Sequence, residues 1–123
     1  MTDRPKLVGF NRLLLAFVNS WKGFRGALAA EAAFRQEVLL ASVMIPLGAW
    51  LGKTGIEKAL LISSMLLVLI VELLNTGIET VVDRIGLERH VLSGLAKDVG
   101  STAVLLSFTV LIVTWGFVLF GPV

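Results

Sequence analysis

The sequence predicts an all-α membrane protein, with three transmembrane helices preceded by an amphipathic surface helix. Three observations support this prediction. The 123-residue chain is 56% hydrophobic with a mean hydropathy of +0.89, whereas soluble domains of this length are far more polar. Apolar runs without a charge occupy residues 38–52, 59–71 and 99–120. Before them, large apolar residues recur at helical spacing along a basic segment.

The first helix is expected at about residues 5–30, where apolar side chains recur every three or four positions and form one stripe. Arg12 and Asn19, seven residues apart, lie on the opposite side of this helix. A coiled coil would have the same spacing. The bulky aromatic residues and the basic flank favour a helix lying in the membrane surface. The stripe consists of Leu7, Phe10, Leu14, Phe17, Trp21, Phe24 and Leu28.

The three spans are expected at about residues 32–52, 57–86 and 97–120, because about 20 residues cross the hydrocarbon core. The third contains an uncharged run of that length, and the second contains one interrupted only by Glu72 and Asn75. The first reaches full length only if it begins near Ala32 and carries Arg35 and Glu37 into the interface. The whole chain, residues 1–123, is then a single integral membrane domain.

The distribution of basic residues predicts the orientation. Of 11 Lys and Arg residues, only Lys53 and Lys58 lie between the first and second spans, and none follows the third. Cytoplasmic segments carry the excess of positive charge, so the N-terminus and the 84–98 loop are expected in the cytoplasm. The pI of 9.4 then reflects orientation, and we expect no nucleic-acid partner. The chain has no cysteine and therefore no thiolate metal site.

A polar face marks the cytoplasmic end of the second span. Glu72, Asn75, Glu79 and Asp83 are spaced by three, four and four residues, which places them on one stripe of a helix. Three acids on one face repel each other, so a cation should meet them or some should be protonated. They could pair with bases of neighbouring helices and only hold the bundle together. Ionisable residues inside a membrane are more often functional.

These residue types suit phosphoryl transfer to a lipid alcohol. Carboxylates bind Mg²⁺, which usually arrives with phosphates, and the deepest acid, Glu72, could accept a hydroxyl proton. Further acids and bases occur in "EAAFRQE" (31–37) and "AKDVGS" (96–101) at the same cytoplasmic level. "GAWLGKT" (48–54) is one residue short of a phosphate-binding P-loop and follows a helical pattern, so we assign it no role.

Several motifs in order resemble the prokaryotic diacylglycerol kinase family: "SWKGFRGAL", "EAAFRQE", "LLISS", "VELLNTGIETVVDRIG" and "LSGLAKDVGSTAVLL". The resemblance covers about residues 10–118. It implies a homotrimer of subunits with three transmembrane helices and one surface helix. It also implies transfer of the γ-phosphoryl group of MgATP to diacylglycerol, giving phosphatidic acid.

The resemblance also implies roles for individual residues. Glu72 matches the family's catalytic base, and Glu31 and Glu79 match ligands of the Mg²⁺ that accompanies ATP. The expected ATP contacts are Arg12, Asn19, Asn75, Asp83, Glu88, Arg89, His90, Lys97 and Asp98. The expected lipid-substrate residues are Trp21, Arg25, Arg35, Gln36, Ser101 and Trp115.

Two alternatives stay open from the sequence. An undecaprenol kinase would share the fold and the ATP site, although "AFRQE" and "VVDRIG" look more like the diacylglycerol branch. A non-enzymatic membrane helix bundle would pair the acids of residues 72–83 with bases and bind no nucleotide. Against it, Glu72 and Asn75 have no basic residue within one helical turn.

Overall fold

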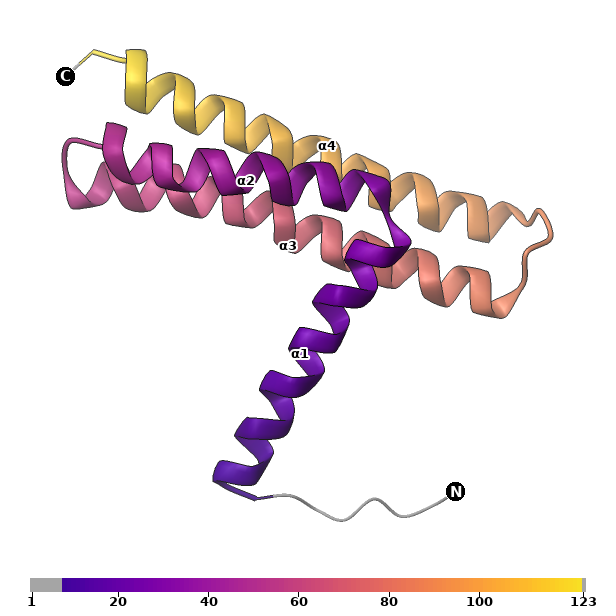
Figure 1. Cartoon of the computed structure of the whole chain (residues 1–123). Coiled ribbons are helices and arrows are strands. Elements are labelled where there is room, and N and C mark those ends of the chain that lie inside the picture. Colours follow the sequence, from indigo (N-terminus) through magenta and orange to yellow (C-terminus); the bar gives the residue numbers. More distant parts are fainter. Residues whose placement is uncertain (1–7, 123) are drawn as a thin grey trace.

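The computed structural model describes residues 8–122, and its secondary structure is entirely helical (Figure 1). The helices are α1 (Phe10–Ala30), α2 (Ala32–Leu51), α3 (Gly55–Ile85) and α4 (Val91–Phe120). The predicted all-α class is confirmed. The surface helix was expected from about residue 5, and residues 5–7 lie outside the described part of the chain. Among the described residues α1 begins at Phe10, after Gly9, whose φ of 64° is a left-handed conformation that favours glycine.

Helices α2, α3 and α4 form a bundle, and each is long and apolar enough to cross a membrane. α3 packs against both α2 and α4 (Figure 1). The buried core joins Ala41 of α2, Met65 and Val68 of α3, and Leu111 of α4. Most other large apolar side chains of the bundle are exposed, as expected of surfaces that lipid or another copy of the chain would cover.

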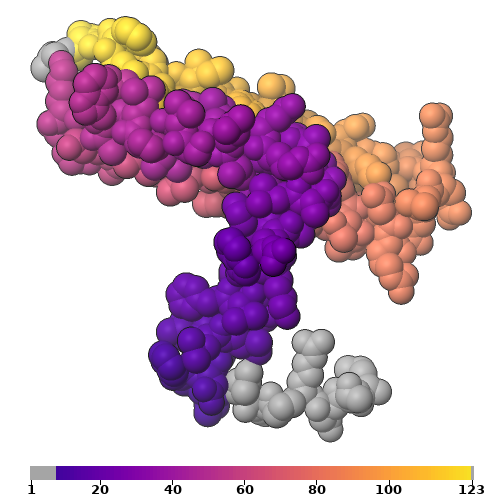
Figure 2. All heavy atoms as spheres, viewed as in Figure 1, coloured from indigo at the N-terminus to yellow at the C-terminus, as the bar shows by residue number. Residues whose placement is uncertain are grey.

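The chain turns sharply at Glu31, between α1 and α2. Glu31 is extended (φ −123°, ψ 116°), so the two helices do not continue into one another. Arg35 stabilises the turn, because its Nη1 donates to the carbonyl oxygens of Leu28 at 2.6 Å and Ala29 at 3.3 Å. As a result α1 projects from the side of the bundle as a separate arm (Figures 1 and 2). The predicted surface helix is therefore a separate element that lies at an angle to the three candidate spans.

α3 and α4 continue together past the beginning of α2 (Figure 1). They contain 31 and 30 residues, more than the roughly 20 that a bilayer requires. α4 begins at Val91, upstream of the span expected at about 97–120, because the side chain of His90 caps it. His90 Nδ1 accepts a hydrogen bond of 3.1 Å from the backbone N–H of Leu92. The polar face of α3 lies toward this projecting end.

Candidate functional site

Two carboxyl groups meet in the interior between α2 and α3. The exposed fractions are 6% for Glu72 of α3 and 8% for Glu37 of α2. The two side chains face each other, and Glu37 Oε2 has no hydrogen-bond partner among residues 8–122. Within residues 8–122 neither carboxyl has an ion-pair partner. Burying unpaired carboxyl groups costs free energy, so a cation or hydroxyl group that reached these oxygens would recover part of that cost.

A second carboxyl pair lies at the turn between α1 and α2. Glu31 lies against Glu79 of α3, and this contact raises the pKa of Glu31 above its ordinary value of 4.5. The hydrogen bond between the two carboxyls contributes most, followed by burial and by the charges of Glu79 and Glu72, while Arg35 opposes the increase. Two adjacent carboxyl groups that resist ionising together form a site for a cation.

This pair fits the Mg²⁺ that the resemblance implies. No cluster of three or more His, Asp or Glu side chains with metal-site geometry occurs among residues 8–122. Mg²⁺ does not need one, since it is usually held by one or two carboxylates while phosphates and water complete its octahedron. Glu31 and Glu79 would supply those carboxylates, and Asn75 touches the second of them.

Asn75 connects the polar face of α3 to α4. Its Nδ2 donates a hydrogen bond of 3.2 Å to Glu79 Oε1. Its Oδ1 is buried, has no hydrogen-bond partner in the described part of the chain, and points at Gly100 of α4. The amide is therefore confined between a carboxylate on its own helix and the backbone of the next one.

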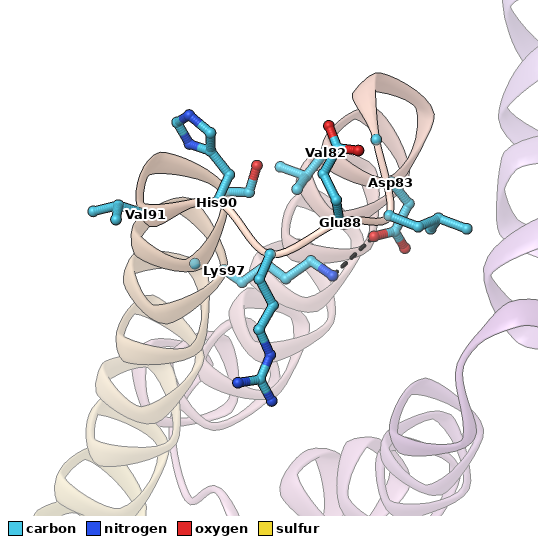
Figure 3. A pocket seen from close by; sticks show the side chains of 11 residues that line it. Val82, Asp83, Glu88, His90, Val91 and Lys97 are labelled. Atoms are coloured by element: carbon cyan, nitrogen blue, oxygen red, sulfur yellow. Dashed lines mark hydrogen bonds and ion pairs between the residues drawn. The ribbon is translucent and has the colours of Figure 1, made fainter.

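The projecting end of the bundle contains a hollow of about 500 Å³, shown in Figure 3. Lys97 Nζ lies 2.8 Å from Asp83 Oδ1 and joins α4 to α3 across it. Five of the predicted ATP contacts line this hollow: Asp83, Glu88, Arg89, His90 and Lys97. Asp98 is exposed and follows Lys97 on α4. The hollow is open, carries basic and acidic side chains on a partly apolar lining, and begins one helical turn beyond Glu79 on α3. Its basic side chains suit a phosphate-bearing ligand.

Four predicted residues on α1 do not reach this cluster within one chain. Arg12, Asn19, Trp21 and Arg25 are exposed on the arm that leaves the bundle (Figure 1). Trp21 stacks on Phe24 of the same helix, with ring centroids 6.0 Å apart. A second subunit that supplied these side chains, or a movement of α1, would bring them to a ligand held by the acids of α3.

The remaining lipid candidates are dispersed. Gln36 and Ser101 are exposed, and Arg35 bonds to the carbonyls at the end of α1. Trp115 packs against Gly48 of α2, and its indole N–H donates to the carbonyl of Leu61 at 3.1 Å. The structure therefore places Trp115 among bundle contacts remote from Glu72 along the helices.

Two residues of this region were not assigned a role from the sequence. Glu37 ends the "EAAFRQE" motif but reads as one more interfacial acid, and only the packing of α2 on α3 turns it toward Glu72. Gly100 follows "AKDV". A single glycine inside a helical pattern can indicate close packing of a neighbour, and this was the signal in the sequence that could have identified it.

Comparison with known proteins identifies the family. The model of a family described as prokaryotic diacylglycerol kinase matches residues 18–119. The chain belongs to the prokaryotic diacylglycerol kinase family. The match extends from the middle of α1 almost to the end of α4, so it includes both carboxyl pairs and the Lys97–Asp83 pair.

Individual members of the family are similar in sequence to this chain along nearly their whole length. The diacylglycerol kinase of Escherichia coli is 51% identical over 113 residues, which are 92% of this chain and 93% of that protein. That of Haemophilus influenzae is 49% identical over 115 residues, 94% and 98% of the two chains. That of Pseudomonas aeruginosa is 51% identical over 113 residues, 92% of each.

Family membership resolves one of the alternatives. The chain is a kinase-family enzyme with several membrane spans, which argues against a non-enzymatic bundle. The contacts agree, because a purely structural set of acids should be neutralised by bases. Among the described residues only Asp83 of the α3 face forms an ion pair.

Proposed function

We propose that the protein transfers the γ-phosphoryl group of MgATP to the free hydroxyl of diacylglycerol, giving ADP and phosphatidic acid. The observation that carries this proposal is the buried carboxyl of Glu72, which has no cationic partner in the described chain and lies beside the Glu31–Glu79 pair. The relatives' name, diacylglycerol kinase, supports this alcohol as the acceptor.

Glu72 is proposed as the general base. The lipid hydroxyl oxygen forms a bond to the γ-phosphorus as the bond from that phosphorus to the bridging oxygen of ADP breaks. The hydroxyl proton passes to the Glu72 carboxylate. Burial suits this role because it excludes water. The lipid hydroxyl is then the group that gives its proton to Glu72.

The phosphates are proposed to lie between the carboxyl pair and the hollow at the projecting end. Glu31 and Glu79 would hold Mg²⁺, which when bound neutralises charge on the transferring phosphoryl group. Lys97 enters the hollow from α4 and would contact the phosphates, while Asp83 limits its movement. Positioning and charge stabilisation account for most of the catalysis in reactions of this type.

The active unit is proposed to be a homotrimer with composite sites. Within the described chain, four predicted site residues on α1 are exposed: Arg12, Asn19, Trp21 and Arg25. A hollow between α1 and α3 is lined largely by small residues: Gly23, Gly26, Ala27, Ala30, Leu73, Thr76, Gly77 and Thr80. Small residues allow membrane helices to approach closely. A neighbouring subunit at this face would bring its own side chains to the α3 acids.

The excess of Lys and Arg at the projecting end and before α2 supports an inner-membrane protein whose N-terminus and active site face the cytoplasm. ATP would then reach the hollow from the cytosol, while diacylglycerol would enter from the bilayer. This arrangement places the reaction at the level where α3 and α4 leave the membrane.

The experiment is a kinase assay in mixed micelles, with purified protein, ATP, Mg²⁺ and either diacylglycerol or undecaprenol. Wild type is compared with Glu72→Gln and with the matched control Glu57→Gln, which removes a carboxyl from the opposite end of α3. We expect phosphatidic acid from wild type and control and almost none from Glu72→Gln.

Each other outcome has a defined meaning. Product from undecaprenol alone would assign the chain to the undecaprenol branch with the same mechanism. Full activity of Glu72→Gln would remove Glu72 as the base. Absence of product from both alcohols, in folded protein, would refute the proposed reaction.

A further inference from the structure

Gly100 marks a close approach of α4 to the polar face of α3. It is buried, and a Cβ built on its backbone would overlap Oδ1 of Asn75. Of the described residues outside its own helix, Asn75 alone comes within 4 Å of that position. The missing side chain at residue 100 is therefore the space that the Asn75 amide occupies.

The contact fixes which way the amide of Asn75 points. On one side Nδ2 donates to Glu79 Oε1 at 3.2 Å. On the other side, Oδ1 is buried against Gly100, and no described residue forms a hydrogen bond with it. Oδ1 is not held at this position by a hydrogen bond of its own. The orientation of the Asn75 amide therefore depends on the Nδ2 bond to Glu79 and on the space that Gly100 leaves.

Other glycines of α4 show that this packing is specific. A Cβ at Gly94 or Gly116 would meet no atom of residues 8–122 within 4 Å. Glycine lowers the stability of a helix interior relative to alanine. At Gly100 the missing side chain makes room for Asn75, whereas no side chain fills the corresponding space at Gly94 or Gly116 in the described chain.

We propose that Gly100 is a positioning residue for phosphoryl transfer, which leaves room for Asn75 to orient the carboxylate of Glu79. The inference rests on the proposed function of Glu79 as a ligand of the nucleotide's Mg²⁺. Alanine at position 100 is accommodated at least cost by rotation of the Asn75 side chain, since the overlapping atom is the end of a flexible group. That rotation breaks the bond to Glu79 while the helix backbones stay packed.

The test compares Gly100→Ala with Gly116→Ala, a substitution on the same helix with open space around it. For Gly100→Ala we expect kcat to fall by up to about 10²-fold, the cost of misplacing a reacting group by about 1 Å. We also expect a higher Mg²⁺ concentration at half-maximal rate and an unchanged KM for diacylglycerol. The Gly116→Ala protein should keep wild-type values.

A second readout needs no turnover. Ligands that bind only the folded protein raise its unfolding midpoint. The thermal unfolding midpoint of each variant is therefore measured at increasing Mg²⁺ concentrations. Gly100→Ala should require more Mg²⁺ for the same increase, with a wild-type midpoint in its absence. Wild-type kinetics and wild-type Mg²⁺ response in Gly100→Ala would overturn the inference.

A double variant separates crowding of Asn75 from a general packing defect. Serine at position 75 is shorter and no longer reaches the space at residue 100. Gly100→Ala should therefore cause no further loss in an Asn75→Ser background, even if the single Gly100→Ala protein folds poorly. An additional loss of the same size would overturn the inference. An inactive wild type would refute the proposed reaction instead, and the Mg²⁺ unfolding titration would still decide the role of Gly100.

Discussion

Lys97 Nζ lies 2.8 Å from Asp83 Oδ1 and joins the beginning of α4 to the end of α3. The pair is half exposed, with 44% and 49% of the two side chains accessible. Exposed ion pairs add little to stability, so the arrangement serves better to hold an ammonium in the hollow at the projecting end than to hold the helices together.

The first prediction concerns this pair. Lys97→Met should lower kcat/KM for ATP by about 10²- to 10³-fold, the usual effect of removing one preorganised donor to developing charge. Asp83→Asn should raise KM for ATP more modestly, since the ammonium remains but is less confined. Steady-state kinetics and thermal unfolding of both variants check this. A large decrease in the unfolding midpoint of either would make the pair structural.

Glu37 should affect stability more than chemistry. Its carboxyl faces Glu72 in the interior, and two carboxyl groups in contact cannot both ionise without cost. Glu37→Gln removes one of them and supplies an amide donor, so we expect it to stabilise the metal-free protein by on the order of 1 kcal/mol. Activity should fall far less than in Glu72→Gln. Unfolding and kinase assays of Glu37→Gln, with Glu57→Gln as control, check this prediction. A Glu37→Gln protein as inactive as Glu72→Gln would contradict it.

The pH dependence of stability should report on Glu31. Its pKa in the folded protein is raised by Glu79, by burial and by Glu72, so folding favours the protonated form. The resulting stabilisation is complete below the ordinary pKa of 4.5 and is lost as the pH rises through the folded value. The unfolding midpoint of metal-free wild type should thus decline over this range more than that of Glu31→Gln. Parallel pH profiles of the two proteins would contradict the assignment.

Trp115 should behave as a packing residue of the bundle. Its indole donates to the Leu61 carbonyl at 3.1 Å and lies against Gly48. Trp115→Phe should destabilise the protein by about 1 kcal/mol, in the range of hydrogen bonds between membrane helices, with KM for diacylglycerol unchanged. Unfolding and kinetics distinguish this from the lipid contact expected from the sequence, which would raise KM without changing stability.

Subunit mixing tests the composite site. Arg12→Ala and Glu72→Gln are each expected to be nearly inactive alone. If one site takes Arg12 from one subunit and Glu72 from another, trimers assembled from both variants contain some sites with both native residues. Co-refolded mixtures should regain part of the wild-type turnover. No gain over the separate variants would place the two residues in sites built by single chains.

Local patterns made much of this architecture predictable. Hydropathy identified three candidate spans. The first begins at Ala32, as predicted from the roughly 20 residues that a helix needs to cross the bilayer. Spacing placed Glu72, Asn75, Glu79 and Asp83 on one face, because the helical period depends only on neighbours along the chain. The Asn75–Glu79 bond across one turn is a direct consequence.

Contacts between helices required the tertiary structure. The rotation of α2 turns Glu37 inward to Glu72, and the approach of α4 brings Gly100 against Asn75. Neither relationship follows from hydropathy, because rotation and crossing of packed helices depend on how all their side chains interlock. The sequence by itself thus determined the number of spans, the polar face and the family motifs. Only the tertiary structure decided which buried groups meet across that face, since residues on different helices become neighbours only by packing.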